Sequence, residues 1–426
     1  MLPFHRERKF GRIHVVQSCL SSNPRYSHQS PELKSMFETY RQRYQKELLD
    51  SVVPFWERHS IDTYCGGYFT CLDRFGAVYD TRKYIWLQGR AIWTFSKLYN
   101  EAERRQEWLD AAAQGVQFVR QHAFDAEGRC YFSLMQDGSP ASFQRKPYGA
   151  VFIVAGFLEY SKAIGDPALR REAIDLFWRI QSWIEAPTLL DRPAFAGLPT
   201  TSNLAEVMVT IMLLLDLMAV DNDPRYSSLL ADSITAALKH REPRSNVLME
   251  QVGKDGTFHL DSPDGRLLNP GHSIEAAWFL LLALRKQPNP ALQKQVLSIM
   301  ESSLEFGWDQ QYGGIYYFMD IEGRPPLPLE SNMKLWWVHT EAIYAVILAY
   351  TTTRNSRWLT HLERLDDYAF RHFSDPEYGE WFGYCDREGV PSNLCKGNNY
   401  KGFFHLPRFL LMSIQEMAAF DLAETP

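Results

Sequence analysis

The feature that most constrains the fold of this chain is a motif that recurs along almost its whole length. Each copy has small residues, then aromatic residues, then a turn with an acidic residue and a glycine, as in Gly66-Gly67-Tyr68-Phe69 followed by Asp73 and Gly76. The copies are marked by Tyr68, Tyr131, Phe195 (a weaker copy), Phe258, Tyr316 and Trp381. Successive markers lie 58 to 65 residues apart, which predicts six similar units rather than unrelated domains.

Each unit has room for two helices beside its hairpin. An apolar run follows each marker, and a run with one charged face precedes the next marker. In unit one these runs are residues 85–98 and residues 106–122. Alternating buried and half-exposed helices predict an all-α (α/α)6 barrel of six helical hairpin units, with short β-hairpins at one end. The periodicity leaves an open helical solenoid as the alternative.

The repeats predict one catalytic domain over residues 36–426 without a linker. Residues 1–35 differ, because they contain six Lys/Arg and two acidic residues. This stretch lacks the apolar core of a secretory signal. We expect it to be a disordered extension, or to precede a true start at Met36, where a helical pattern begins.

Composition excludes several classes of function. A net charge of −6 gives no general attraction to nucleic acid or to anionic membranes, and no run approaches 18 apolar residues. The six cysteines are scattered and show no zinc-ligand spacing, which is typical of a reduced compartment. We therefore expect a cytoplasmic protein without a metal, whose partner is a small molecule rather than nucleic acid or a membrane.

Polar residues recur where each hairpin meets its inner helix. In a barrel these junctions face one funnel, so the same position can be compared between units. Units one and five align closely, with Gln88 opposite His339 and Arg90 opposite Glu341. In chain order the polar junction groups are Arg90, Tyr148, His272, Glu341, His405 and Arg408. Polar groups at an aromatic-lined mouth suit a polyhydroxylated ligand such as a sugar.

Two histidines are the strongest candidates for acid–base chemistry. His272 follows Pro270-Gly271 at a helix start, and Glu275 lies one turn further on the same face. A neighbouring carboxylate fixes an imidazole's tautomer and raises its pKa, so we expect Glu275 to support His272. His405 also lies at the start of an inner helix.

Long ordered segments of the chain resemble the N-acylglucosamine 2-epimerase family, which includes mammalian renin-binding protein. The resemblance covers roughly residues 45–420. It is carried by GGYFTCLD (66–73), VYD (78–80), WLQGR (86–90), NPGHSIEA (269–276), GWD (307–309), YGG (312–314), KLWWVH (334–339), DPEYGEWFGY (375–384) and KGFFHLPR (401–408).

The resemblance implies an (α/α)6 barrel and the metal-free interconversion of N-acetylglucosamine and N-acetylmannosamine. The residues similar to the family's essential ones are Arg90, His272, His405 and Glu341. We assign substrate binding to Glu275, Trp86, Gln88, Tyr148, Trp337, His339, Tyr400 and Arg408. The resemblance also implies a homodimer and ATP as an effector rather than a substrate, although the chain has no P-loop that would place a nucleotide site.

The reaction expected from these residues removes a proton at C2, next to the C1 aldehyde of the opened sugar. One histidine acts as base, the other as acid, and Arg90 stabilises the oxyanion at O1. Segments 148–152 and 210–212 depart from the family pattern, which leaves open a 2-epimerase of a non-acetylated sugar such as mannose or glucose. Further alternatives are an aldose–ketose isomerase, a glycoside hydrolase using Glu206, Glu341 or Glu380, and a non-catalytic binding protein.

Overall fold

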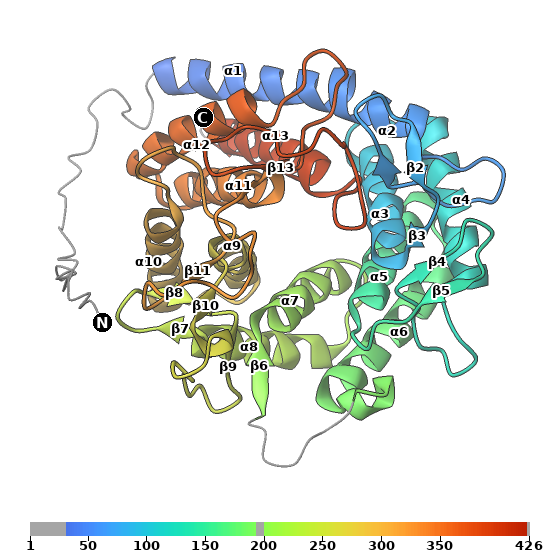
Figure 1. The fold of residues 1–426 in the computed structure, drawn as a ribbon, viewed down its shortest axis with the longest axis horizontal. Coiled ribbons are helices and arrows are strands. Elements are labelled where there is room, and N and C mark those ends of the chain that lie inside the picture. Colours follow the sequence, from blue (N-terminus) through green and yellow to red (C-terminus); the bar gives the residue numbers. More distant parts are fainter. Residues whose placement is uncertain (1–30, 193–199, 424–426) are drawn as a thin grey trace, which may run out of the picture.

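Two concentric rings of helices build the molecule (Figure 1). The structure is a computed structural model that describes residues 31–192 and 200–423. Within these residues six helices form the inner ring: α3 (Ile85–Glu101), α5 (Tyr148–Ile164), α7 (Leu204–Met218), α9 (Pro270–Lys286), α11 (Trp336–Thr353) and α13 (His405–Ala423). Outside them lie α4 (Gln106–His122), α6 (Pro167–Glu185), α8 (Pro224–Lys239), α10 (Pro290–Gly307) and α12 (Arg357–His372). This arrangement confirms the predicted (α/α)6 barrel.

The junction between α5 and α6 shows how the sequence ends one helix and starts the next. α5 is apolar nearly all round and ends at Gly165, whose φ of 68° favours glycine. Asp166 then caps α6, because its side chain accepts hydrogen bonds from the backbone N–H groups of Ala168 and Leu169. The chain therefore reverses sharply from the inner to the outer ring.

The sixth unit takes its outer helix from the other end of the chain. α1 (Pro31–Lys46) packs against α13, and it is followed by a π-helix (Glu47–Val52) and α2 (Val53–His59). The ring of Phe37 in α1 lies 5.6 Å from that of Phe420 in α13. The helix begins at Pro31 rather than near residue 36, and Leu33 is buried, so the expected domain boundary is too late. Residues 1–30, the rest of the expected extension, lie outside the described residues.

Short antiparallel strands join neighbouring units at one rim. The strand that enters an inner helix pairs with the next unit's hairpin, which holds the N-termini of these helices at the same end. Such pairs are β3 (Lys83–Tyr84) with β4 (Ser133–Leu134), β6 (Thr201–Asn203) with β9 (Gln251–Gly253), β10 (Leu267–Leu268) with β11 (Met319–Asp320), and β12 (Lys334–Leu335) with β13 (Tyr384–Cys385).

The remaining strands lie within single units. β1 (Cys71–Leu72) pairs with β2 (Val78–Asp80), β7 (Arg241–Glu242) with β8 (Val247–Leu248), and β5 (Pro140–Ser142) extends the sheet of β4. Two 3-10 helices, Pro187–Leu190 and Asp264–Arg266, complete the rim. The weak repeat at Phe195 lies outside the described residues. Among those described, no helix is both long and apolar enough to span a membrane.

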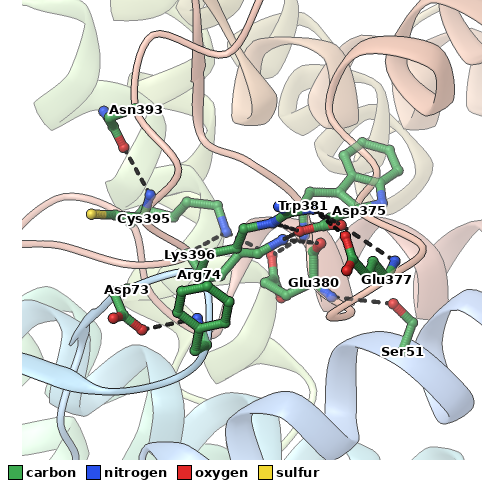
Figure 2. A network of polar contacts seen from close by, with 12 residues as sticks. Ser51, Asp73, Arg74, Asp375, Glu377, Glu380, Trp381, Asn393, Cys395 and Lys396 are labelled. Atoms are coloured by element: carbon green, nitrogen blue, oxygen red, sulfur yellow. Dashed lines mark hydrogen bonds and ion pairs between the residues drawn. The ribbon is translucent and has the colours of Figure 1, made fainter.

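An ion pair between Arg74 and Asp375 ties the first hairpin to the sixth (Figure 2). Asp375 accepts from Nζ of Lys396 at 2.8 Å and from Nε of Arg74 at 2.7 Å, and Arg74 belongs to the first unit's hairpin. Lys396 has no exposed surface, and its Nζ also donates to the carbonyl oxygen of Glu380. These contacts join the ends of the repeat array, so the barrel is closed and not the open solenoid.

Candidate active site

The predicted catalytic groups meet at the N-terminal ends of inner helices. Arg90 lies in the second turn of α3, His272 in the first turn of α9, and His405 begins α13. Glu341 lies in the second turn of α11, between α9 and α13. The charge of Arg90 affects the pKa of both histidines, so these side chains share one electrostatic environment.

His405 is fixed by Glu341. Its Nδ1 donates to Oε1 of Glu341 at 2.7 Å, which leaves Nε2 as the basic nitrogen of the neutral imidazole. Arg408 lies 2.7 Å from the same oxygen, and Nε1 of Trp278 donates to Oε2 at 3.0 Å. The carboxylate of Glu341 is therefore fully engaged and orients His405 from behind.

His272 has a different carboxylate partner from the one expected. Its Nδ1 lies 2.9 Å from Oε1 of Glu250, whereas Glu275 accepts from Nη2 of Arg408 at 2.6 Å. Side chains in an α-helix tilt toward its N-terminus, so His272 reaches back toward the preceding hairpin and not forward to Glu275. Glu250 escaped prediction because its only signal is one carboxylate in the mostly apolar segment 247–252.

Trp337 contacts both histidines. Its ring centroid is 5.1 Å from that of His272 and 5.7 Å from that of His405. Tyr317 was not predicted from the sequence. Its ring centroid lies 6.3 Å from that of the same indole, and the two rings are nearly perpendicular. The two imidazoles therefore share one aromatic wall, a surface suited to the apolar face of a sugar ring.

Arg90 is a buried cation held by aromatic rings. Its guanidinium carbon lies 4.4 Å from the ring centroid of Trp86, 4.1 Å from that of Phe152 and 4.7 Å from that of Phe404. The position depends on Gly89, because a Cβ there would lie 2.4 Å from the backbone of Phe152. Nε of Arg90 has no hydrogen-bond partner among the described residues.

The charges around Arg90 suit it to bind an anion. Glu275 and Glu341 pair with Arg408 instead, and among the described residues no carboxylate forms an ion pair with Arg90. Burial, followed by the charge of Arg408, lowers the pKa of Arg90 to about 9. A negatively charged oxygen beside this guanidinium would stabilise its charged form.

The two histidines have pKa values shifted in opposite directions. Burial lowers the pKa of His405 well below its ordinary value, and the charges of Arg90 and Arg408 act in the same direction. Burial also disfavours a charge on His272, but the carboxylate of Glu250 outweighs it and raises the pKa of His272. Compared with a free imidazole, the site therefore favours the neutral form of His405 and the protonated form of His272.

Arg408 supplies a cation within a cluster of acidic groups. Glu275, Glu341 and His405 bring potential metal-ligand atoms within 4.8 Å of one another. Nη2 of Arg408 approaches both carboxylates, at 2.6 Å and 2.7 Å, so a guanidinium already bridges them. These residues therefore fit a site in which Arg408 is the cation that holds the two carboxylates.

Two predicted substrate-binding residues lie behind the site. Gln88 is fully buried and forms both amide hydrogen bonds with the backbone of Tyr68, each at 2.8 Å. His339 is fully buried too; its Nε2 accepts from the N–H of Ile315 at 2.9 Å, and its Nδ1 donates to the carbonyl of Leu335 at 2.7 Å. The polar side-chain atoms of Gln88 and His339 are hydrogen-bonded to the backbone. Both residues therefore stabilise hairpins and do not bind the substrate as predicted.

The other predicted binding residues lie at the rim and the wall. Nε1 of Trp86 donates to the carbonyl of Asn399 at 3.2 Å, and its ring meets that of Tyr400, which is 57% exposed. Tyr148 begins α5 and is half-buried; burial raises its pKa, and the charges of Glu206 and Glu250 act in the same direction. Tyr148 therefore lies on the side of the site that carries Glu250.

Comparisons with known proteins identify the family and the fold of the chain. The sequence profile of the N-acylglucosamine 2-epimerase (GlcNAc 2-epimerase) family matches residues 67–406. The N-acylglucosamine 2-epimerase of Rattus norvegicus is 38% identical over 394 residues, which cover 91% of this chain and 94% of the rat protein.

Two solved structures share the fold. The cellobiose 2-epimerase from Bacillus thermoamylovorans superposes with a TM-score of 0.76 at 21% identity, covering 89% of this chain and 99% of the other. A D-mannose isomerase gives a TM-score of 0.74 at 18% identity, covering 91% and 99%. On the profile match, the sequence identity and the shared barrel, the chain belongs to the N-acylglucosamine 2-epimerase family.

Proposed function

We propose that this protein is a sugar 2-epimerase, an isomerase that interconverts N-acetylglucosamine and N-acetylmannosamine. The observation that carries the proposal is the pair of imidazoles beside Trp337, each with its Nδ1 held by a carboxylate. Inverting a carbon needs a base on one face and an acid on the other. Two histidines with opposite pKa shifts meet that need.

The reaction begins with the neutral histidine. Nε2 of His405 takes the proton from C2 of the open-chain sugar, the C2–H electron pair forms a C1–C2 double bond, and O1 becomes an oxyanion. Arg90 stabilises that oxyanion. The protonated Nε2 of His272 then delivers a proton to the opposite face of C2 while the C1 carbonyl re-forms. In the reverse direction the histidines exchange roles.

The acetylated sugar is proposed from the 38% identical relatives that carry the name N-acylglucosamine 2-epimerase. A hydrolase that uses Glu206, Glu341 or Glu380 is disfavoured. Arg408 binds Glu341, and Lys401 and Trp56 bind Glu380, so only Glu206 is left and the second carboxylate that a hydrolase needs is missing. The proposal includes no metal, since Arg90 and Arg408 supply the cations. ATP as an effector, a homodimer and a cytoplasmic location stay predictions from the sequence.

Incubation in D2O tests the proposal. The purified protein is given N-acetylmannosamine, or mannose or glucose in parallel, and the C2 proton is followed by NMR. We expect N-acetylglucosamine with deuterium at C2. Deuterium at C1 of a ketose would identify an aldose–ketose isomerase instead, and turnover of mannose or glucose alone would reassign the substrate. No exchange with any of these sugars would overturn the proposed function.

A further inference from the structure

The two histidine–carboxylate pairs differ in what else touches the carboxylate. Glu341 contacts Arg408 and Trp278 in addition to His405, so its negative charge is shared with a guanidinium. Glu250 has a single side-chain hydrogen bond among the described residues, the one to His272. No lysine or arginine of the described residues pairs with Glu250, so its negative charge acts on His272 and also on the nearby His240, Tyr148 and Tyr317.

The Glu250–His272 contact is built into the rim. The backbone N–H of Glu250 donates to the carbonyl of Leu267 at 3.3 Å, and its carbonyl accepts from the N–H of Leu204, the first residue of α7. The side chains of Glu250 and His272 are 12% and 24% exposed. Because the pair is largely withdrawn from water, the attraction between its charges is screened less than in an exposed ion pair, and it works against the desolvation cost of burying the imidazolium.

The other charged or titratable groups near His272 come from several helices. Glu275 of α9 favours the charged imidazole, whereas Arg90 of α3 disfavours it. His405 of α13 contacts the same Trp337 ring, and the charges of the two histidines interact. Glu250 is thus the one nearby carboxylate that is both hydrogen-bonded to His272 and not paired with arginine within the described chain.

We propose that Glu250 is a positioning residue that holds His272 in its protonated form, with Nε2–H free for the sugar, and so determines which histidine begins as the acid. This inference rests on the proposed function for its catalytic consequence. Its effect on the protonation of His272 follows from the Glu250–His272 contact alone, and this effect can be measured without any sugar. Glu341 cannot play the same role for His405, because Arg408 neutralises it.

The test replaces the charge while keeping the size, with Glu250→Gln. Histidine ring NMR over a pH titration, assigned by the signal missing in His272→Asn, gives the pKa of His272. We expect this pKa to fall in the variant because the anion that stabilises the imidazolium is gone. With sugar, we expect kcat to fall about 10–100-fold, as for other residues that orient a functional histidine. The alkaline limb of the kcat/KM profile should move to lower pH, because the acid loses its proton earlier.

Two further variants complete the test. Glu242→Gln is the matched control, since Glu242 is a buried carboxylate of the same hairpin that bonds to Arg244; it should leave the His272 titration unchanged. Glu250→Asp keeps the charge and should keep the pKa of His272 raised. If Glu250→Gln fails to fold, the unmodified protein still decides: a His272 pKa below its ordinary value of about 6.5 overturns the inference. So does a Glu250→Gln variant that loses activity without shifting the titration.

A raised His272 pKa in a protein that turns over no sugar would sink the proposed function and leave the role of Glu250 in place. Normal turnover of N-acetylmannosamine together with an unshifted pKa of His272 would support the proposed function and overturn the role of Glu250. The two failures are therefore distinguishable.

Discussion

The two imidazoles differ in charge state because their surroundings differ, although both start inner helices. His405 faces two arginines, and the carboxylate that orients it is already neutralised. His272 faces a carboxylate with its charge intact. When neighbouring groups push two titratable residues apart in this way, one is ready as a base and the other as an acid.

Arg90 carries a prediction at the same scale. We expect Arg90→Met to lower kcat by about 10²–10³-fold, the usual cost of removing one oxyanion donor. The thermal unfolding midpoint should stay or rise, because a buried cation without a carboxylate partner is lost from an aromatic cage. Steady-state kinetics and calorimetry check both parts. A fall in the thermal unfolding midpoint that accompanies the loss of kcat would mean that Arg90 stabilises the fold rather than the oxyanion.

Residue types and repeat register predicted much of the site but not its connections. Aligning units one and five correctly placed Gln88 opposite His339, yet both side chains turn to hairpin backbone. Glu275 shares a helix with His272, yet it pairs with Arg408, whose place the pattern along one helix cannot give. Such partners come from tertiary packing between units, so one sequence does not contain a direct signal for them.

At the scale of elements, one motif fixes the hairpins. Lys83, Lys334 and Lys396 are each fully buried, and each donates from Nζ to an aspartate at the start of its own unit's hairpin: Asp62, Asp309 and Asp375. Arginine provides a second cation for Asp309 and for Asp375. Within the described residues, Asp62 has an ion pair with Lys83 alone. The helices followed from apolar periodicity, whereas these cross-links and the strand pairs between units did not.

Lys83→Met should therefore destabilise the protein more than Lys334→Met or Lys396→Met. Removing one member of a buried ion pair costs about 3–5 kcal/mol, because the other charge is left in the interior. Urea denaturation at pH 7 measures the difference, and the double variant Lys83→Met/Asp62→Leu should recover part of it. Equal denaturation midpoints for the three single variants would show that the arginines at Asp309 and Asp375 add nothing.

At the scale of the whole molecule, the barrel is closed by the chain's first described helix. α1 covers the outer face of α13, the helix that carries His405 and Arg408 (Figure 1). Counting repeats forward from the first hairpin predicts six inner helices but leaves the last without an outer partner. That partner lies before the first marker, mostly in the helical pattern that begins at Met36, and its place against α13 becomes clear only in three dimensions.

The most direct test of the central claim is C2 exchange by the single variants His272→Asn and His405→Asn in D2O. In a two-histidine epimerase each variant should lose interconversion, with a fall on the order of 10²–10⁴, the usual contribution of a positioned acid or base. Each should still exchange the C2 proton of one epimer without inverting it, and the two variants should exchange opposite epimers. Interconversion at the unmodified rate by either variant, or exchange of the same epimer by both, would contradict the account.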